Sequence, residues 1–174
     1  MKGRQTDLDV EGRKKTGPLP NRSRRESIVL NDAPPTWYAF TDLVEGDSIT
    51  SQVSLTSEGL ESFIALSGDR AAAHVDPAHA QAMGFKDRIV QGLCTALPFS
   101  RLLGMYLPGP NCVIQSLDFK FKKEVYVGEM LTYRVAIERL VPAVGAVRLA
   151  LSVTRGDGEV ACAGMAQCVF PEAR

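Results

Sequence analysis

The fold of this chain is decided by residues 89–106, which read IVQGLCTALPFSRLLGMY. Apolar side chains occupy most sides of a helix drawn through this stretch, and a helix that is apolar all round is a buried one. Pro98 is expected to kink or shift the helix, because proline lacks an amide hydrogen and its ring clashes with the preceding turn. Residues 107–110, LPGP, end it. The stretch therefore predicts one long helix at the centre of the domain.

The chain after this helix changes to the two-residue period of β-strands. Residues 112–122 alternate and predict a strand, as do residues 130–141, 144–154 and 159–170. The Arg-Gly-Asp-Gly run at 155–158 is a hairpin signal between the last two. The first of these strands is expected to place one set of side chains on one face: Val113, Gln115, Leu117, Phe119 and Phe121. Helices early and antiparallel strands late predict an α+β fold in which the sheet wraps around the buried helix.

The chain before the central helix carries a strand and two shorter helices. Residues 48–55 alternate with period two and predict a half-buried strand. Thr56 or Ser57 can cap the helix that follows, and Gly68 is a natural C-terminal stop. Asp76, followed by a proline, is a clear start for the next helix. The segment between the two helices is thus a loop, a position where functional groups are often held.

Length and composition limit the classes of protein that need to be considered. The 174 residues suit one domain plus a tail, and 20 basic residues balance 20 acidic ones. This balance gives no argument for nucleic acid or an anionic membrane as a partner. No apolar run is long enough to span a bilayer and no secretory signal is visible, so we expect a cytoplasmic protein. The cysteines lack a metal-binding spacing and are expected to be buried, reduced thiols: Cys94, Cys112, Cys162 and Cys168.

Residues 1–35 differ in composition from the rest of the chain. They are rich in Lys and Arg, poor in large apolar residues and broken by four prolines. Such a segment cannot bury enough apolar surface to offset the entropy cost of ordering it. We therefore expect a mostly disordered basic tail over residues 1–35 and a single folded domain over residues 36–174.

An acid–base pair is the best candidate for chemistry. Asp69 and His74 stand five positions apart in a loop of small residues, and Gly92 lies at the start of the central helix. A carboxylate and an imidazole facing helix-terminal amides suit chemistry next to a carbonyl. Each residue also has a plainer interpretation: a turn cap for Asp69, a structural histidine for His74 and a packing glycine for Gly92. Arg70 either meets a phosphate or carboxylate or is a solvated charge.

The sequence resembles a known family, the MaoC-like dehydratases, which are the (R)-specific enoyl-CoA hydratase branch of the hot-dog fold. The resemblance runs from about residue 44 to residue 170 and keeps the order of the motifs along the chain. The matching stretches are FIALSGD at 63–69, HVDP at 74–77, IVQGL at 89–93, SRLLG at 100–104, LPGP at 107–110 and VYVGE at 125–129.

The resemblance implies a function. It implies a hot-dog homodimer whose sheets join edge to edge, and a thioester substrate carried by coenzyme A or an acyl carrier protein, in fatty acid or polyketide metabolism. In that family an aspartate and a histidine five residues later hold a catalytic water, and Asp69 and His74 match these positions. Gly92 matches the amide donor for the oxyanion. No metal or redox cofactor is implied, since coenzyme A or phosphopantetheine enters as part of the substrate.

Two departures from the family pattern keep other reactions open. Ala71 and Ala72 stand where the family usually has asparagine and proline, and Gln91 stands where it usually has histidine. We assign Ala71, Gln91 and Arg70 to the substrate-binding region. The changes fit a tuned or bulkier substrate site, or another thioester reaction such as hydrolysis or conjugate addition. A non-catalytic acyl-binding or partner subunit is a third reading. Nearby basic residues either meet pantetheine phosphates or protect a strand edge: Arg101, Lys120, Lys122 and Lys123.

Overall fold

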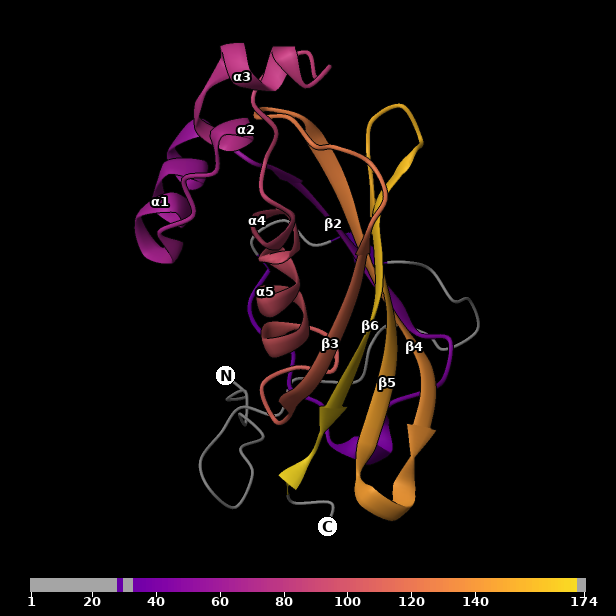
Figure 1. The fold of residues 1–174 in the computed structure, drawn as a ribbon. Helices are drawn as coiled ribbons and strands as arrows, with labels where there is room; N and C mark the ends of the chain where they lie inside the picture. The colour runs from indigo at the N-terminus through magenta and orange to yellow at the C-terminus, as the bar shows by residue number, and fades with distance from the viewer. Residues whose placement is uncertain (1–27, 30–32, 172–174) are drawn as a thin grey trace, which may run out of the picture.

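The structure is a computed structural model that describes residues 28–29 and 33–171, with the side chains at 28–29 excepted. Its centre is a six-stranded sheet with the strand order β1-β2-β4-β5-β6-β3 (Figure 1). The strands are β1 (Ile28–Val29), β2 (Ser48–Ser54), β3 (Val113–Phe121), β4 (Met130–Val141), β5 (Ala146–Thr154) and β6 (Val160–Val169). All neighbours pair antiparallel except β1 and β2, which pair parallel.

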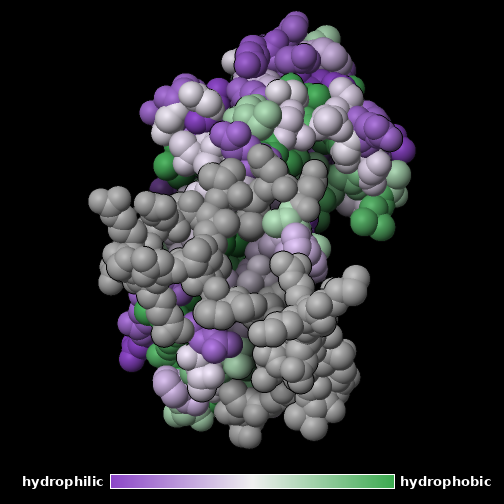
Figure 2. Space-filling view, turned by 180° about the vertical axis from the view of Figure 1, so that it is seen from behind, coloured by the Kyte–Doolittle hydropathy of each residue, from purple (hydrophilic) through white to green (hydrophobic). Residues whose placement is uncertain are grey.

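The helices are placed on one side of this sheet. They are α1 (Ser57–Ser67), α2 (Ala72–Val75), α3 (Pro77–Ala82), α4 (Gly92–Ala96) and α5 (Pro98–Met105), with 3-10 turns at Phe40–Asp42 and Pro142–Val144. Figure 1 shows α4 and α5 end to end along the sheet, with α1 to α3 grouped beside its upper end. The opposite view shows mainly hydrophilic residues over the tip that carries α3 (Figure 2). The layer arrangement is the α+β architecture predicted from the sequence.

Local signals set the ends of the helices that precede the site. The Thr56 side chain accepts a hydrogen bond from the Gly59 amide and caps α1, and Gly68 ends it in the left-handed conformation at φ 73°. The Asp76 carboxylate accepts from the amides of Ala78 and His79 and caps α3. These caps are confirmed. The segment between the two helices was predicted to be a loop, but it carries the short helix α2, because its alanines favour a helical turn closed by the bonds from the His74 and Asp76 amides to the carbonyls of Ala71 and Ala72.

The core lies between α5 and the middle of the sheet. Phe99 and Leu103 are fully buried, and the Phe99 ring meets Tyr133 of β4 edge to face at 5.3 Å. Each such side chain contributes about 1.5–3 kcal/mol by leaving water. Tyr133 also donates its hydroxyl hydrogen to the Thr95 carbonyl at 2.8 Å, which fixes α4 against the same strand. The sheet therefore holds the helix that carries the candidate site.

The central helix differs from the prediction at its start and in its burial. It begins at Gly92 rather than residue 89, and Pro98 divides it into α4 and α5, since proline has no amide hydrogen for the helical ladder. Leu93 and Leu97 are 66% and 50% exposed, so the helix is not buried on every side. The physical reason is that the sheet covers only one face of α4.

The alternation in β3 also differs from the prediction. A bulge between Ile114 and Ser116 shifts the pairing with β6, which breaks the two-residue period. Phe119 is partly buried against the core as expected, but Leu117 and Phe121 are 45% and 47% exposed. β3 is the last strand of the sheet and pairs only with β6, so one of its edges has no neighbour in the described chain.

Ordered structure begins before residue 36, inside the segment predicted to be a disordered tail. β1 pairs with β2, the Tyr106 hydroxyl donates to the Ala33 carbonyl at 2.8 Å, and the Thr36 amide donates to Met105 at 2.8 Å. The rest of the predicted tail, residues 1–27 and 30–32, lies outside the described residues. The boundary between tail and domain stays a prediction. Among the described residues, no helix is long and apolar enough to cross a membrane.

Candidate active site

His74 lies on α2 and is fixed by a backbone contact from a distant segment. Its Nδ1 is 2.8 Å from the Ile89 carbonyl oxygen, and the Ile89 amide donates to the Ala73 carbonyl at 3.1 Å. Because a carbonyl can only accept, Nδ1 carries the hydrogen of this bond. In the neutral ring Nε2 is therefore the nitrogen left to accept a proton. The segment around Ile89 thus sets both the place and the tautomer of His74.

Asp69 lies in the turn just past the end of α1. Its Oδ1 accepts a hydrogen bond from the Ala71 amide at 3.1 Å, and its own amide donates to Ser67 Oγ at 3.2 Å. This is an Asx-type turn, which Asp forms readily because its short side chain reaches the backbone two residues on. Asp69 is half-buried. The turn interpretation from the sequence is therefore correct for one carboxylate oxygen and leaves the other oxygen available.

Gln91 faces inward and touches the Asp69 segment. The residue is only 3% exposed, and its side-chain Nε2 donates to the Asp69 carbonyl oxygen at 3.3 Å. Its backbone carbonyl accepts from the Thr95 amide and hydroxyl at 2.9 Å and 3.2 Å. The side chain of Gln91 is thus buried against the Asp69 backbone, and its assignment to the substrate-binding region stays a prediction.

Gly92 is the first residue of α4. The first amides of a helix have no acceptor within the helix, so the Gly92 amide is free of an intrahelical bond. A Cβ at Gly92 would lie 3.0 Å from two ring atoms of Phe121. A side chain here would therefore need Phe121 to move. Packing against Phe121 therefore favours glycine at position 92 even when no substrate is bound.

A cavity of about 290 Å³ joins some of the predicted residues and not others. Its lining residues are His74, Phe85, Ile89, Val90, Gly92, Thr95, Phe121, Lys122, Lys123, Glu124, Val125 and Ala161. Asp69 and Gln91 are not among the lining residues, and Arg70 and Ala71 are exposed. Within residues 33–171 no hydrogen bond or ion pair joins Asp69 to His74. The structure therefore brings His74 and Gly92 to one cavity and connects Asp69 to it through Gln91.

Sequence reasoning missed several parts of the cavity wall. Phe121 was predicted only to share one face of its strand with Phe119, and Thr95 carried no signal of a cavity position. Lys122 and Lys123 were considered only as phosphate contacts or edge protection, and the structure places both on the cavity wall. Lys123 also lies 3.6 Å from Glu159. The end of the alternating pattern after Phe121 was the one sequence signal for this wall.

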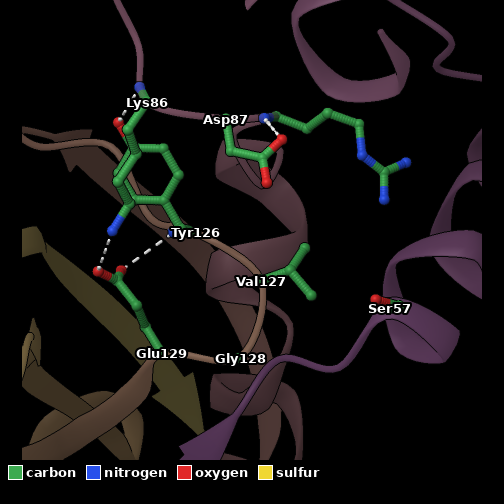
Figure 3. A pocket seen from close by; sticks show the side chains of 8 residues that line it. Ser57, Lys86, Asp87, Tyr126, Val127, Gly128 and Glu129 are labelled. Atoms are coloured by element: carbon green, nitrogen blue, oxygen red, sulfur yellow. Dashed lines mark hydrogen bonds and ion pairs between the residues drawn. The ribbon is translucent and has the colours of Figure 1, made fainter. Parts of the chain in front are cut away.

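A second, larger hollow is lined in part by the residues that follow Phe85 (Figure 3). It measures about 640 Å³ and is lined by Ser57, Lys86, Asp87, Arg88, Tyr126, Val127, Gly128 and Glu129. Figure 3 shows Lys86, Tyr126 and Glu129 together on one wall and Ser57 on the other. The Lys86 Nζ is 4.0 Å from the Tyr126 ring centre and 3.8 Å from Glu129 Oε1. We call this hollow the charged groove.

The thiols of Cys94 and Cys162 are poorly suited to act as nucleophiles. All four cysteines are free, as predicted, and Cys94, Cys162 and Cys168 are buried. Burial raises the pKa of Cys94, and burial raises that of Cys162 to about 11 against a smaller opposing effect of Lys122. A thiol with a raised pKa is mostly protonated at neutral pH and is a poor nucleophile. No cluster of metal-ligating side chains is found among the described residues.

Comparison with known proteins identifies the family. The MaoC like domain model matches residues 43–157, which is more than half of the chain. This chain belongs to the MaoC-like family. The family predicted from the sequence motifs is therefore confirmed.

Individual relatives of this MaoC-like protein agree with the family match. An (R)-specific enoyl-CoA hydratase of Rhodospirillum rubrum is 33% identical over 134 residues, which cover 77% of this chain and 92% of the relative. A mitochondrial 3-hydroxyacyl-(acyl-carrier-protein) dehydratase of Arabidopsis thaliana is 33% identical over 89 residues, which cover 51% of this chain and 52% of the relative. The solved (R)-hydratase from A. caviae has a TM-score of 0.71 at 30% identity, covering 74% of this chain and 98% of that one. The predicted hot-dog fold is confirmed.

Proposed function

We propose that this MaoC-like protein is a hydratase/dehydratase that adds water to a trans-2-enoyl thioester, or removes it from the 3-hydroxyacyl form. The observation that carries the proposal is that His74 and Gly92 line one largely apolar cavity. A cavity with few convergent polar groups suits an acyl thioester. The named hydratase and dehydratase relatives support the same class of reaction.

His74 and Asp69 are proposed to share the proton transfers. In hydration, water loses one proton to a base, its oxygen bonds to C3, and C2 gains one proton. Nε2 of His74 is suited to take and return a proton because Nδ1 is occupied by Ile89. The Asp69 oxygen that does not bind Ala71 is proposed to hold the water with His74.

Gly92 is proposed to stabilise the charge that develops on the thioester oxygen. When a nucleophile adds at C3, electron density moves to the carbonyl oxygen and forms an enolate. The Gly92 amide, without an acceptor inside α4, can donate to that oxygen. A donor held in place before the reaction stabilises the transition state without reorganisation. The absence of a side chain allows the carbonyl to come close.

The carrier and the assembly are part of the proposal. Coenzyme A or phosphopantetheine is proposed as the thiol part of the substrate, and adding water transfers no electrons to an acceptor, so the reaction itself calls for no redox cofactor. Arg70 and Ala71 are exposed beside Asp69, where a carrier would pass. A homodimer is proposed in which the open β3 edge and the exposed Leu93 and Leu97 are covered by a second copy.

The test is an assay in which two signals are followed separately. Short, medium and branched trans-2-enoyl thioesters on coenzyme A and on acyl carrier protein are offered to the wild type and to Asp69→Asn. We expect loss of the conjugated enoyl absorbance without release of free thiol. Asp69→Asn removes a charged base, and we expect it to lower the rate by about 100-fold or more.

Other results would identify another reaction. Release of free thiol would replace the proposal by a thioesterase. No change in either signal would exclude hydration of these substrates and move the search to addition of an amine or another nucleophile. A rate that Asp69→Asn leaves unchanged would remove Asp69 from the site.

A further inference from the structure

We infer that Gln91 is a positioning residue of the site, whose buried amide holds the backbone of Asp69 and thereby the Asp69 carboxylate. This inference rests on the proposed function of Asp69. It differs from the substrate-binding role expected from the sequence. The carrying observation is a long-range hydrogen bond from an interior side chain to the catalytic loop.

The contact comes from a residue that has little freedom to move. Gln91 is 3% exposed and stands at the N-cap of α4, with its carbonyl held by both the amide and the hydroxyl of Thr95. Thr95 is fixed in turn by Tyr133, whose hydroxyl donates to the Thr95 carbonyl at 2.8 Å. The amide of Gln91 is therefore anchored to the sheet before it reaches Asp69.

Asp69 needs such a support because its own segment is weakly held from outside. It follows Gly68, the C-terminal cap of α1, and among the described residues the hydrogen bonds of its amide and its carboxylate reach only Ser67 and Ala71, which are nearby in sequence. The bond from Gln91 Nε2 to the Asp69 carbonyl, at 3.3 Å, spans 22 positions of sequence. It ties the turn to the interior of the domain.

The same short segment also fixes the other proposed groups. Ile89 holds His74 through its carbonyl and α2 through its amide, Gln91 holds Asp69, and Gly92 is the proposed oxyanion donor. The relative positions of base, acid and donor therefore depend on one run of four residues. Displacements of about 1 Å in such an arrangement can lower a rate by about 100-fold.

The amide oxygen gives a second observation. Gln91 Oε1 is buried and has no hydrogen-bond partner among the described residues. Buried polar atoms are almost always paired, and a bound water or substrate hydroxyl could supply the missing donor. An apolar side chain of the same size would avoid this unpaired oxygen, so packing alone does not explain a glutamine here.

The experiment compares Gln91→Met with Gln91→His in the full chain. Methionine keeps the length and burial but cannot donate to Asp69, whereas histidine retains an N–H donor. We expect kcat of Gln91→Met to fall about 10- to 100-fold with KM changed by less than about threefold. We expect Gln91→His to keep kcat within about threefold of the wild type. Gln52→Met, at an exposed position on β2, is the matched control.

Hydrogen exchange provides a measurement that does not depend on activity. If Gln91 holds the turn, backbone amides of the peptide around Asp69 and Ala71 exchange faster in Gln91→Met than in the wild type or Gln91→His. The inference is overturned if Gln91→Met keeps its kcat, or if both variants lose it equally while exchange around Asp69 is unchanged. A Gln91→Met that fails to fold leaves Gln91→His against the wild type as the deciding pair: a loss of kcat in a folded Gln91→His overturns the inference.

Failure of the proposed function gives a different result. In that case the wild type itself leaves enoyl thioesters unchanged, and exchange around Asp69 still reports on the hydrogen bond from Gln91. An active wild type with an inactive Asp69→Asn and a fully active Gln91→Met would retain the proposed function and reject this inference alone.

Discussion

The cavity and the charged groove differ in what their polar groups do. In the cavity, His74 has one ring nitrogen fixed by Ile89 and the other available, and Gly92 has an amide free of intrahelical bonding. In the charged groove the side chains already have partners: Lys86 with Glu129, Arg88 with Glu61, and Asp87 with a backbone amide. The groove is more than twice as large, at about 640 Å³ against 290 Å³.

We therefore use the availability of polar groups, and not the size of the hollow, to choose the candidate site. A group already bonded within the protein must lose that bond before it can serve a ligand, which costs free energy. Glu129 shows this most clearly, because its two oxygens accept from Tyr126 at 3.0 Å and Arg155 at 3.1 Å. The side chains of the charged groove therefore stabilise the fold, and we expect the reaction in the smaller cavity.

The largest difference in kcat should appear between a variant that changes one side chain in the cavity and a variant that changes one in the charged groove. His74→Gln keeps a donor for Ile89 but loses the titratable Nε2, so we expect kcat to fall about 100- to 10,000-fold. Lys86→Met in the charged groove should leave kcat within about twofold. Steady-state kinetics of both variants tests this. Equal losses in the two would mean that the groove also takes part in the reaction.

The next contrast separates two reasons for glycine at position 92. Gly92→Ala should lower kcat about tenfold or more and destabilise the fold by about 1–3 kcal/mol through crowding against Phe121. In Gly92→Ala/Phe121→Leu, we expect the stability to return while kcat stays low, because the carbonyl still cannot approach. Kinetics and urea unfolding measure the two effects. Recovery of both would show that Gly92 serves packing only.

A smaller effect is expected from the charged groove, and on stability alone. Glu129→Gln weakens the bonds to Arg155 and Lys86, and we expect the free energy of unfolding to fall by about 2 kcal/mol. The kcat of Glu129→Gln should remain within about twofold of the wild-type value. Steady-state kinetics measures kcat, and urea unfolding measures the stability. Asp87→Asn is the matched control, since its carboxylate is exposed. A large loss of kcat without loss of stability would contradict the structural role of the groove.

The smallest effect concerns the apolar wall beside the cavity. Cys162 follows the lining residue Ala161, and its pKa is raised to about 11 from an ordinary value of 9.0. The folded state therefore prefers the protonated thiol, so its contribution to stability is present below about pH 9 and is lost as pH rises toward 11. We expect about 1 kcal/mol to be lost between about pH 8 and pH 10. Urea unfolding of Cys162→Ala should show a shallower loss over that window.

Much of the fold was predictable from the sequence because its signals are local. β4 begins and ends where the alternation predicted, at Met130 and Val141, and Thr56, Gly68 and Asp76 end or begin helices as their caps indicated. Cap chemistry and side-chain alternation depend on neighbours a few residues away. The order of the motifs likewise identified the family, which the comparisons confirm.

The pattern of residues was therefore enough to predict most strands and helix ends, the family, and the segment between α1 and α3 that carries Asp69 and His74, but not the helix α2 within that segment. Only the tertiary structure decided which of these side chains meet. It placed Gln91 inside against the Asp69 backbone, moved Phe121 onto the cavity wall beside Gly92, and left one face of α4 exposed. The cause is the distance along the chain over which the interactions act. A helix cap or a strand period is fixed by adjacent residues, whereas burial and hydrogen-bond partners depend on segments far apart in the sequence.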